Sequence, residues 1–220
     1  MLLFVILVMD LFTTISKSVS AFSDLSEILP LIFRLKFAQK KEIYFLLGLF
    51  FIISAPLKLI SLITAILIIN NMPLYTFMAI SEGILVYFFF SKLLFNKVHN
   101  WPILIIVLFH LLCIVFSQSI FEFNSYSWTF DMLIILLLGI SNLFKLYSND
   151  KIQTSLEGHP EFIITAGWLI YASGSMFTYL MGTSILSGKA GGFYHNAWIF
   201  QCVSNILKNI IICYGIWRSR

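Results

Sequence analysis

Residues 43–69 read IYFLLGLFFIISAPLKLISLITAILII, a long apolar run whose only charged side chain is Lys58. A helix of this length rises about 40 Å, which is enough to cross a hydrocarbon core of about 30 Å. The run lacks the strict alternation of apolar and polar residues that marks the strands of a membrane barrel. It therefore predicts a transmembrane helix.

Similar runs recur along the whole chain. Hydrophobic residues make up 60% and charged residues 11% of the 220 positions, whereas a soluble domain carries about 25% charged residues. We predict an all-α, polytopic membrane helix bundle that forms a single domain over residues 1–220, without a soluble domain. Its seven expected transmembrane helices lie somewhere within 2–35, and at 43–69, 73–95, 102–118, 128–147, 160–185 and 196–217.

Basic residues in the expected loops are distributed unevenly. Lys189 is the single basic residue on one side, and ten lie on the other: Arg34, Lys36, Lys40, Lys41, Lys92, Lys97, Lys145, Lys151, Arg218 and Arg220. Lys and Arg near span ends are retained in the cytoplasm, so the N-terminus is expected outside and the C-terminus inside. The net charge of +4 is thereby explained by topology, and no nucleic-acid partner is expected.

Tryptophans support these boundaries. Trp101, Trp128, Trp198 and Trp217 stand at expected span ends, where amphipathic rings anchor at the headgroup level. We expect a multi-pass protein of a cell membrane, the bacterial inner membrane, with the lipid bilayer as its surroundings.

The first segment is too long for one span, since a helix over residues 2–35 would be about 50 Å long. Either its start projects outward or the helix breaks near Thr13 and Thr14. A polar stripe at helical spacing, expected to face away from lipid, follows this point and comprises Lys17, Ser20, Asp24 and Glu27.

Three charged residues fall inside expected spans. Lys58, Glu82 and Lys208 lie roughly 14–18 Å from the outer ends of their helices when counted at 1.5 Å per residue. Ionisable groups at membrane depth are costly and face the bundle interior. We therefore predict one midplane cluster in which Lys58 or Lys208 pairs with Glu82. The cluster is either a binding site or an ion pair that holds the helices together.

Polar neighbours extend this predicted site. Ser54 and Ser61 share a helix face with Lys58, and Trp198, Gln201 and Asn205 share one with Lys208. The candidate ligand-binding residues are Lys58, Glu82, Trp168, Tyr171, Gln201, Asn205 and Lys208. Catalytic motifs such as GxSxG and HExxH are absent from the sequence, so an enzyme is not the expected class.

Other polar positions receive structural interpretations. His110 has no partner at metal-ligand spacing and is expected to be a core histidine. Asp131 is expected near the outer end of its span, close to water. Gly174, Thr178 and Gly182 form a ridge of small residues that favours close helix packing.

The segments Trp168-Leu-Ile-Tyr-Ala-Ser-Gly174 and Asn205-Ile-Leu-Lys-Asn209 resemble uncharacterised seven-helix membrane proteins of Bacteroidetes. The resemblance covers the last two spans best and implies a seven-helix fold and a signalling context. The first functional hypothesis is therefore a membrane-embedded sensory or ligand-binding module. It would act through a membrane signalling partner or as a homo-oligomer.

The second hypothesis is a retinal-binding protein, with Lys208 as Schiff base and Glu82 as counterion. Trp168 and Tyr171 are similar to the WxxY of microbial rhodopsins. Those proteins have Asp where this chain has Ser204, and heliorhodopsins, which resemble it more closely there, have the opposite orientation.

A small transporter or proton relay is the third hypothesis. Transporters often contain broken helices at the substrate site. Pro56, two residues before Lys58, is the candidate break.

Overall fold

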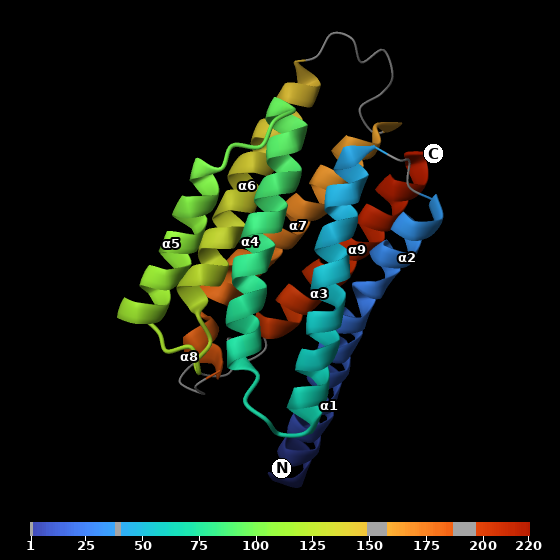
Figure 1. The fold of residues 1–220 in the computed structure, drawn as a ribbon. Coiled ribbons are helices and arrows are strands. Elements are labelled where there is room, and N and C mark those ends of the chain that lie inside the picture. The colour runs from blue at the N-terminus through green and yellow to red at the C-terminus, as the bar shows by residue number, and fades with distance from the viewer. Residues whose placement is uncertain (1, 38–40, 149–157, 187–196) are drawn as a thin grey trace.

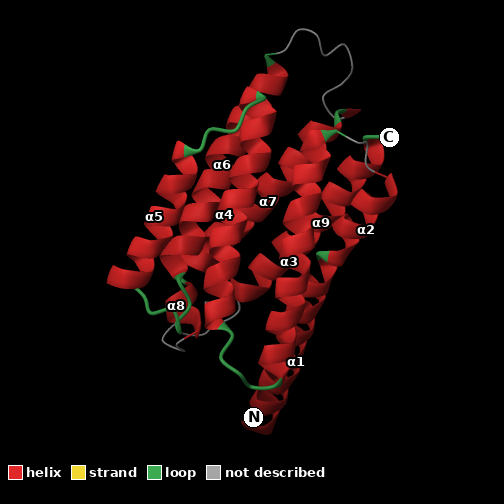
Figure 2. Ribbon diagram, viewed as in Figure 1, coloured by secondary structure: helices red, strands yellow, loops and turns green. Residues whose placement is uncertain are grey.

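The computed structural model describes residues 2–37, 41–148, 158–186 and 197–220, with side chains from residue 14 onward. Every element within these ranges is a helix (Figure 2). The helices are α1 (Leu2–Ser26), α2 (Ile28–Phe37), α3 (Glu42–Ile66), α4 (Met72–Phe95), α5 (Trp101–Phe116), α6 (Ser125–Tyr147), α7 (Pro160–Leu180), α8 (Gly182–Leu186) and α9 (Ala197–Arg218).

Five of the described helices, α3, α4, α6, α7 and α9, are long and apolar enough to cross a membrane. Helix α5 is apolar but has only 16 residues, fewer than the roughly 20 that a span usually needs. The chain is thus an all-helical bundle suited to a membrane, as its composition predicted. Seven spans and their orientation remain predictions.

The long helices lie side by side in one bundle, with the N-terminus at its lower end and the C-terminus at its upper end (Figure 1). We call these the N-terminal and C-terminal ends of the bundle. Helix α7 packs most extensively against α9 and α6, α4 packs against α3 and α6, and α1 and α2 lie along α9. Helix α5 lies at the edge and packs loosely on α4 and α6.

Local sequence sets the helix ends. Proline stands in the first turn of α4, α5 and α7, where its missing N–H costs nothing. Asn96 ends α4 in the left-handed conformation with φ 54°, which Asn tolerates better than most residues. Asn124 caps α6 by accepting a hydrogen bond from the Ser127 N–H.

The first segment breaks elsewhere than expected. Helix α1 continues through Thr13 and Thr14, and the break falls at Glu27, between α1 and α2. Pro30 explains this position, because a proline four residues after Ser26 removes the N–H that the Ser26 carbonyl would accept from. Helix α3 runs without a break through Pro56. The expected break at Pro56 is therefore wrong, and the broken helix is the first one.

The core of the bundle is rich in aromatic residues. Phe50 packs edge-on against Phe51 and Trp168, with ring centroids 5.0 and 4.9 Å apart. Trp128 is buried in the same core, and its ring centroid lies 4.9 Å from that of Tyr179. It therefore belongs to the core, which corrects its predicted place at the membrane surface. Trp101 and Trp217 are exposed at helix ends, as an interfacial position requires.

Small residues on α7 and at the start of α8 allow close packing; the predicted ridge is divided between the two helices because α7 ends at Leu180. A Cβ added at Gly174 would lie 2.9 Å from the Ser204 Cβ of α9. Thr178 donates to the Ala197 carbonyl at 3.0 Å, and Gly182 makes room for the Phe123 ring. Close contact with α9 and with the segment before α6 thus depends on this ridge.

Candidate functional site

Both lysines of the predicted cluster pair with carboxylates of the first segment, one in the last turn of α1 and one at the α1–α2 break. The Lys58 Nζ of α3 lies 3.4 Å from the Asp24 Oδ1. The Lys208 Nζ of α9 lies 3.8 Å from the Glu27 Oε1. The predicted pairing of either lysine with Glu82 is therefore wrong in its partner. The broken first helix supplies both counterions.

Aromatic rings surround the Lys208 ammonium. Its Nζ lies 4.2 Å from the ring centroid of Tyr171, 4.9 Å from that of Trp168 and 5.5 Å from that of Phe50. These distances are within the range of cation–π attraction, about 6 Å. The structure thus brings together three predicted site residues, Lys208, Trp168 and Tyr171. The lysine side chain is 1% exposed, so its charge is fully enclosed by protein.

Glu82 of α4 belongs to the same cluster but has no ammonium partner of its own among the described side chains. It interacts electrostatically with Lys208 and Lys58, and the Tyr171 hydroxyl faces its carboxyl group. Glu82 and Lys58 line one small cavity together with Ser54 and Ser81. The Glu82 Oε1 and the Ser54 Oγ make no hydrogen bond. Two polar atoms are thus left unsatisfied at one place, which is unusual for a buried site.

This cavity has a volume of about 10 Å³. A space of about 10–15 Å³ is the smallest that holds one water molecule. The polar cluster is therefore densely packed. Its cavity is large enough for at most one water molecule and too small for an organic ligand, and a proton needs no space of its own.

Gln201 and Asn205, the remaining predicted site residues, serve two different contacts. The Gln201 Nε2 donates to the Tyr179 hydroxyl at 2.9 Å, and the Tyr179 and Tyr171 hydroxyls lie 3.0 Å apart. Asn205 instead donates to the Ser23 Oγ at 3.0 Å. Gln201 thus joins the cluster through two tyrosines, whereas Asn205 fastens α1 to α9.

A second buried pair lies between α5 and α6. The His110 Nε2 and the Asp131 Oδ1 are 3.3 Å apart, and both side chains are 0% exposed. Gly83, next to Glu82, makes room for the Asp131 carboxylate, since a Cβ there would clash with it. Asp131 also interacts electrostatically with Glu82. The expectation that Asp131 lies close to water is therefore wrong, and His110 has an acidic neighbour.

Carboxylates outnumber cations among these described side chains. The acidic groups are Asp24, Glu27, Glu82 and Asp131, and the basic groups are Lys58, Lys208 and His110. With a proton on His110 the carboxylates exceed the cations by one, and with a neutral His110 they exceed them by two. An unpaired buried charge is costly, and such a group is neutralised when it can bind a proton. Glu82 is the member without an ion-pair partner.

The surroundings of the cluster differ toward the two ends of the bundle. Toward the N-terminal end, the hydroxyls of Tyr171 and Tyr179 lead to Gln201. Beyond Lys58, Asn71 donates to the Ser61 Oγ at 3.1 Å. Toward the C-terminal end, most buried side chains are apolar, among them Leu47, Phe51, Val86, Phe90, Ile212 and Ile216. Two buried polar pairs stand between them, since Asn209 donates to the Ser26 Oγ at 2.7 Å and Asn142 donates to the Thr165 Oγ1 at 2.8 Å. Polar contacts therefore lie on both sides of the cluster, and those joined to it through the Tyr171 hydroxyl lie toward the N-terminal end.

Sequence reasoning missed three members of the site. Asp24 and Glu27 were recognised as part of a polar stripe, but their depth could not be assigned without the position of the helix break. Pro30, three residues after Glu27, was the available signal. Tyr179 gave no signal, because one tyrosine among apolar residues is an ordinary core residue.

The fold and the cluster define the class of this chain as a helical membrane protein with ionisable groups enclosed in its bundle. No family model, curated protein or solved structure matches it. Among the described residues, no group of three or more His, Cys, Asp or Glu side chains is arranged to hold a metal ion.

Proposed function

We propose that the chain is a multi-pass sensory module of a cell membrane whose ligand is a proton bound at Glu82. The excess of carboxylates over cations carries this proposal, with Glu82 as the carboxylate that has no ion-pair partner among the described side chains. A proton bound at Glu82 neutralises the one carboxylate of this set that has no ion pair. Intramembrane ionisable groups often form proton-binding sites, and this cluster gives the proton a defined place.

The size of the cavity favours a proton over a larger ligand. Pockets for organic ligands span about 300–1,000 Å³, whereas the cavity between Lys58 and Glu82 measures about 10 Å³. A retinal chromophore on Lys208 would also have to displace the aromatic rings around its ammonium. The retinal alternative therefore finds less support than the proton.

The uneven surroundings favour a sensor over a relay. The hydrogen-bonded chain of Tyr171, Tyr179 and Gln201 extends from the cluster toward the N-terminal end. Toward the C-terminal end, the buried pairs Asn209–Ser26 and Asn142–Thr165 stand among apolar side chains and are not joined to this chain. A relay needs polar groups on both sides to accept and release the proton. Access from one side suits a group that equilibrates with one compartment.

The proposal includes seven spans with the N-terminus outside, in the bacterial inner membrane. The proton would then come from the outer compartment. The loops that carry Lys40, Lys151 and Lys189 lie outside the described residues, so the charge distribution remains the support for this orientation. Reporter fusions at each loop test it, and a cytoplasmic N-terminus would reverse the sidedness.

The direct test is an infrared pH titration of the protein in lipid nanodiscs. Lowering the pH should produce the C=O band of a protonated carboxylic acid. The ionisable groups that interact electrostatically with Glu82 are Lys58, Lys208, Glu27, Asp131 and Tyr171. The band should disappear in Glu82→Gln and persist in Glu122→Gln, whose side chain is exposed at the bundle surface.

Two results would overturn the assignment to Glu82. One is a band that survives in Glu82→Gln, and the other is a titration that requires Na⁺ or K⁺, which would identify a metal cation as the ligand. Proteoliposomes then separate sensor from relay. A sensor responds to pH on one side without net proton flux, whereas Glu82-dependent flux would establish the relay.

The last part of the proposal is a membrane partner or a second copy that reads the state of the cluster. Mild solubilisation of native membranes should yield a complex larger than the single chain. Recovery of the chain alone under those conditions would contradict this part and leave proton binding intact.

A further inference from the structure

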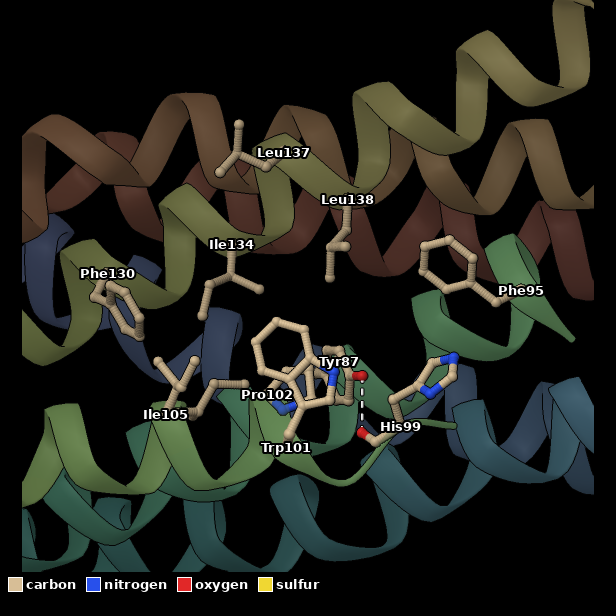
Figure 3. A pocket seen from close by; sticks show the side chains of 11 residues that line it. Tyr87, Phe95, His99, Trp101, Pro102, Ile105, Phe130, Ile134, Leu137 and Leu138 are labelled. Carbon is tan, nitrogen blue, oxygen red and sulfur yellow. Dashed lines mark hydrogen bonds between the residues drawn. The ribbon is translucent and has the colours of Figure 1, made fainter. Parts of the chain in front are cut away.

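A groove runs along α5, on the side of the bundle away from α1. Helix α5 stands apart from α4 and α6 and leaves a cavity of about 490 Å³ between them. Its lining includes Tyr87, Trp101, Ile105, Phe130, Ile134 and Leu138 (Figure 3). We call the group of Lys58, Lys208, Asp24, Glu27 and Glu82 the ion cluster. The groove lies apart from it, and the proposed proton site does not use the groove.

The body of the groove is walled by hydrocarbon. Phe130, Ile134 and Leu138 project from α6 toward Ile105 and Trp101 of α5 (Figure 3). The Tyr87 hydroxyl is already used, since it donates to the His99 carbonyl at 2.9 Å. A cavity of about 490 Å³ lies in the size range of pockets that hold organic ligands. At membrane depth the surrounding medium is itself hydrocarbon.

One end of the groove is polar and held in place. The segment between α4 and α5 is fixed to α4, because Ser91 donates to the Lys97 carbonyl at 2.9 Å and Tyr87 holds His99. The side chains of Lys97 and His99 are exposed there. Trp101, 67% exposed, stands beside them, as rings do at the headgroup level.

Two lysines belong to the same end of the bundle as this mouth, and Lys97 precedes the lining residue His99 by two positions. Lys145 donates to the Leu93 and Leu94 carbonyls at 2.6 and 2.8 Å, and so compensates the negative end of the α4 dipole. The Lys97 ammonium makes no ion pair with another described side chain. Its charge is complementary to a phosphate, and basic sites between helices bind anionic headgroups.

We infer that the groove binds one anionic phospholipid, with an acyl chain between α5 and α6 and its phosphate at Lys97 and His99. The apolar length of the groove matches the chain, and the basic mouth matches the headgroup. A lipid chain fills this space without further polar contacts, which the walls do not offer.

Lipid retention measured by native mass spectrometry tests the inference. The whole protein is reconstituted in nanodiscs of equal parts phosphatidylglycerol and phosphatidylcholine, then released into the gas phase. One phospholipid should remain bound, and phosphatidylglycerol should be enriched several-fold. Ile134→Trp fills the groove and should reduce retention at least fivefold. Leu133→Trp, on the lipid-facing side of α6, is the matched control and should retain the lipid.

A second variant at the mouth of the groove, Lys97→Gln/His99→Gln, which we call the rim variant, provides a test if Ile134→Trp fails to fold. The side chains of Lys97 and His99 are exposed, so their replacement should not disturb folding. It should lose the preference for phosphatidylglycerol, while the exposed Lys41→Gln should keep it. Equal retention in Ile134→Trp and Leu133→Trp would overturn the inference, as would a rim variant with unchanged preference. A dimer that Ile134→Trp dissociates would instead assign the groove to a second copy of the chain.

Discussion

The ion cluster and the groove along α5 lie in the same helix bundle but are packed to very different densities. The cluster encloses charged side chains around a cavity of about 10 Å³, whereas the groove leaves about 490 Å³ between apolar walls. Charges in a bilayer must contact partners, because lipid offers them none. Apolar side chains do not have to contact one another, because a lipid acyl chain can fill the space between them as well as another side chain would. Dense packing therefore follows the charges in this protein.

The largest effect is expected from removing one member of an ion pair. Lys208→Met leaves Glu27 buried without its cation and should lower the free energy of unfolding by about 3–5 kcal/mol. Leu207→Met, on the exposed face of the same helix, should change it little. Unfolding in mild detergent, followed by steric trapping, measures both.

The double variant Lys208→Met/Glu27→Gln sharpens this test. Removing both charges eliminates the uncompensated carboxylate, so most of the lost stability should return. A double variant as unstable as Lys208→Met would show that packing around the lysine stem matters more than its charge. The dense packing of the cluster would then be due to the shape of its side chains and not to their charge.

A smaller effect is expected where α7 and α9 pack closely. Gly174→Ala places a methyl group against Ser204 and should cost about 1–3 kcal/mol through overpacking. Ser173→Ala, one residue earlier and exposed, is the control. Equal stability of the two variants would mean that the helices separate at this point as easily as α5 and α6 do. Thermal unfolding in the same detergent suffices.

The smallest effect is expected at the bundle surface. Lys92 and Glu42 form an ion pair of 2.6 Å, but the Glu42 side chain is 64% exposed. Solvent screens such a pair, so Lys92→Gln should cost at most about 1 kcal/mol, and less at high salt. A loss comparable to that of Lys208→Met would contradict the distinction between enclosed and exposed charges. Unfolding at low and high salt decides this.

Helix positions could be predicted from this sequence because hydrophobicity acts along the chain. The runs at 43–69, 73–95 and 160–185 correspond to α3, α4 and the α7–α8 pair within a few residues. The expectation that Lys58, Glu82 and Lys208 share one region was also a consequence of depth alone. Each of these inferences needs only the distance of a residue from its helix end.

The partners of the charges could not be predicted in the same way. Pairing depends on helix rotation and on which helices are neighbours, and neither is recorded in local hydropathy. Asp24 and Glu27 were assigned to an uncertain segment, and Asp131 was placed near water because it stands early in its span. His110 gave no sign of the acidic side chain that packs beside it.

The break in the first helix has a mechanical consequence. Glu27 is both the counterion of Lys208 and the residue at which α1 gives way to α2. The break in the backbone helix and the carboxylate paired with Lys208 therefore belong to the same residue. A change in the protonation of the cluster would act where α1 meets α2, and both of these helices pack against α3 and α9.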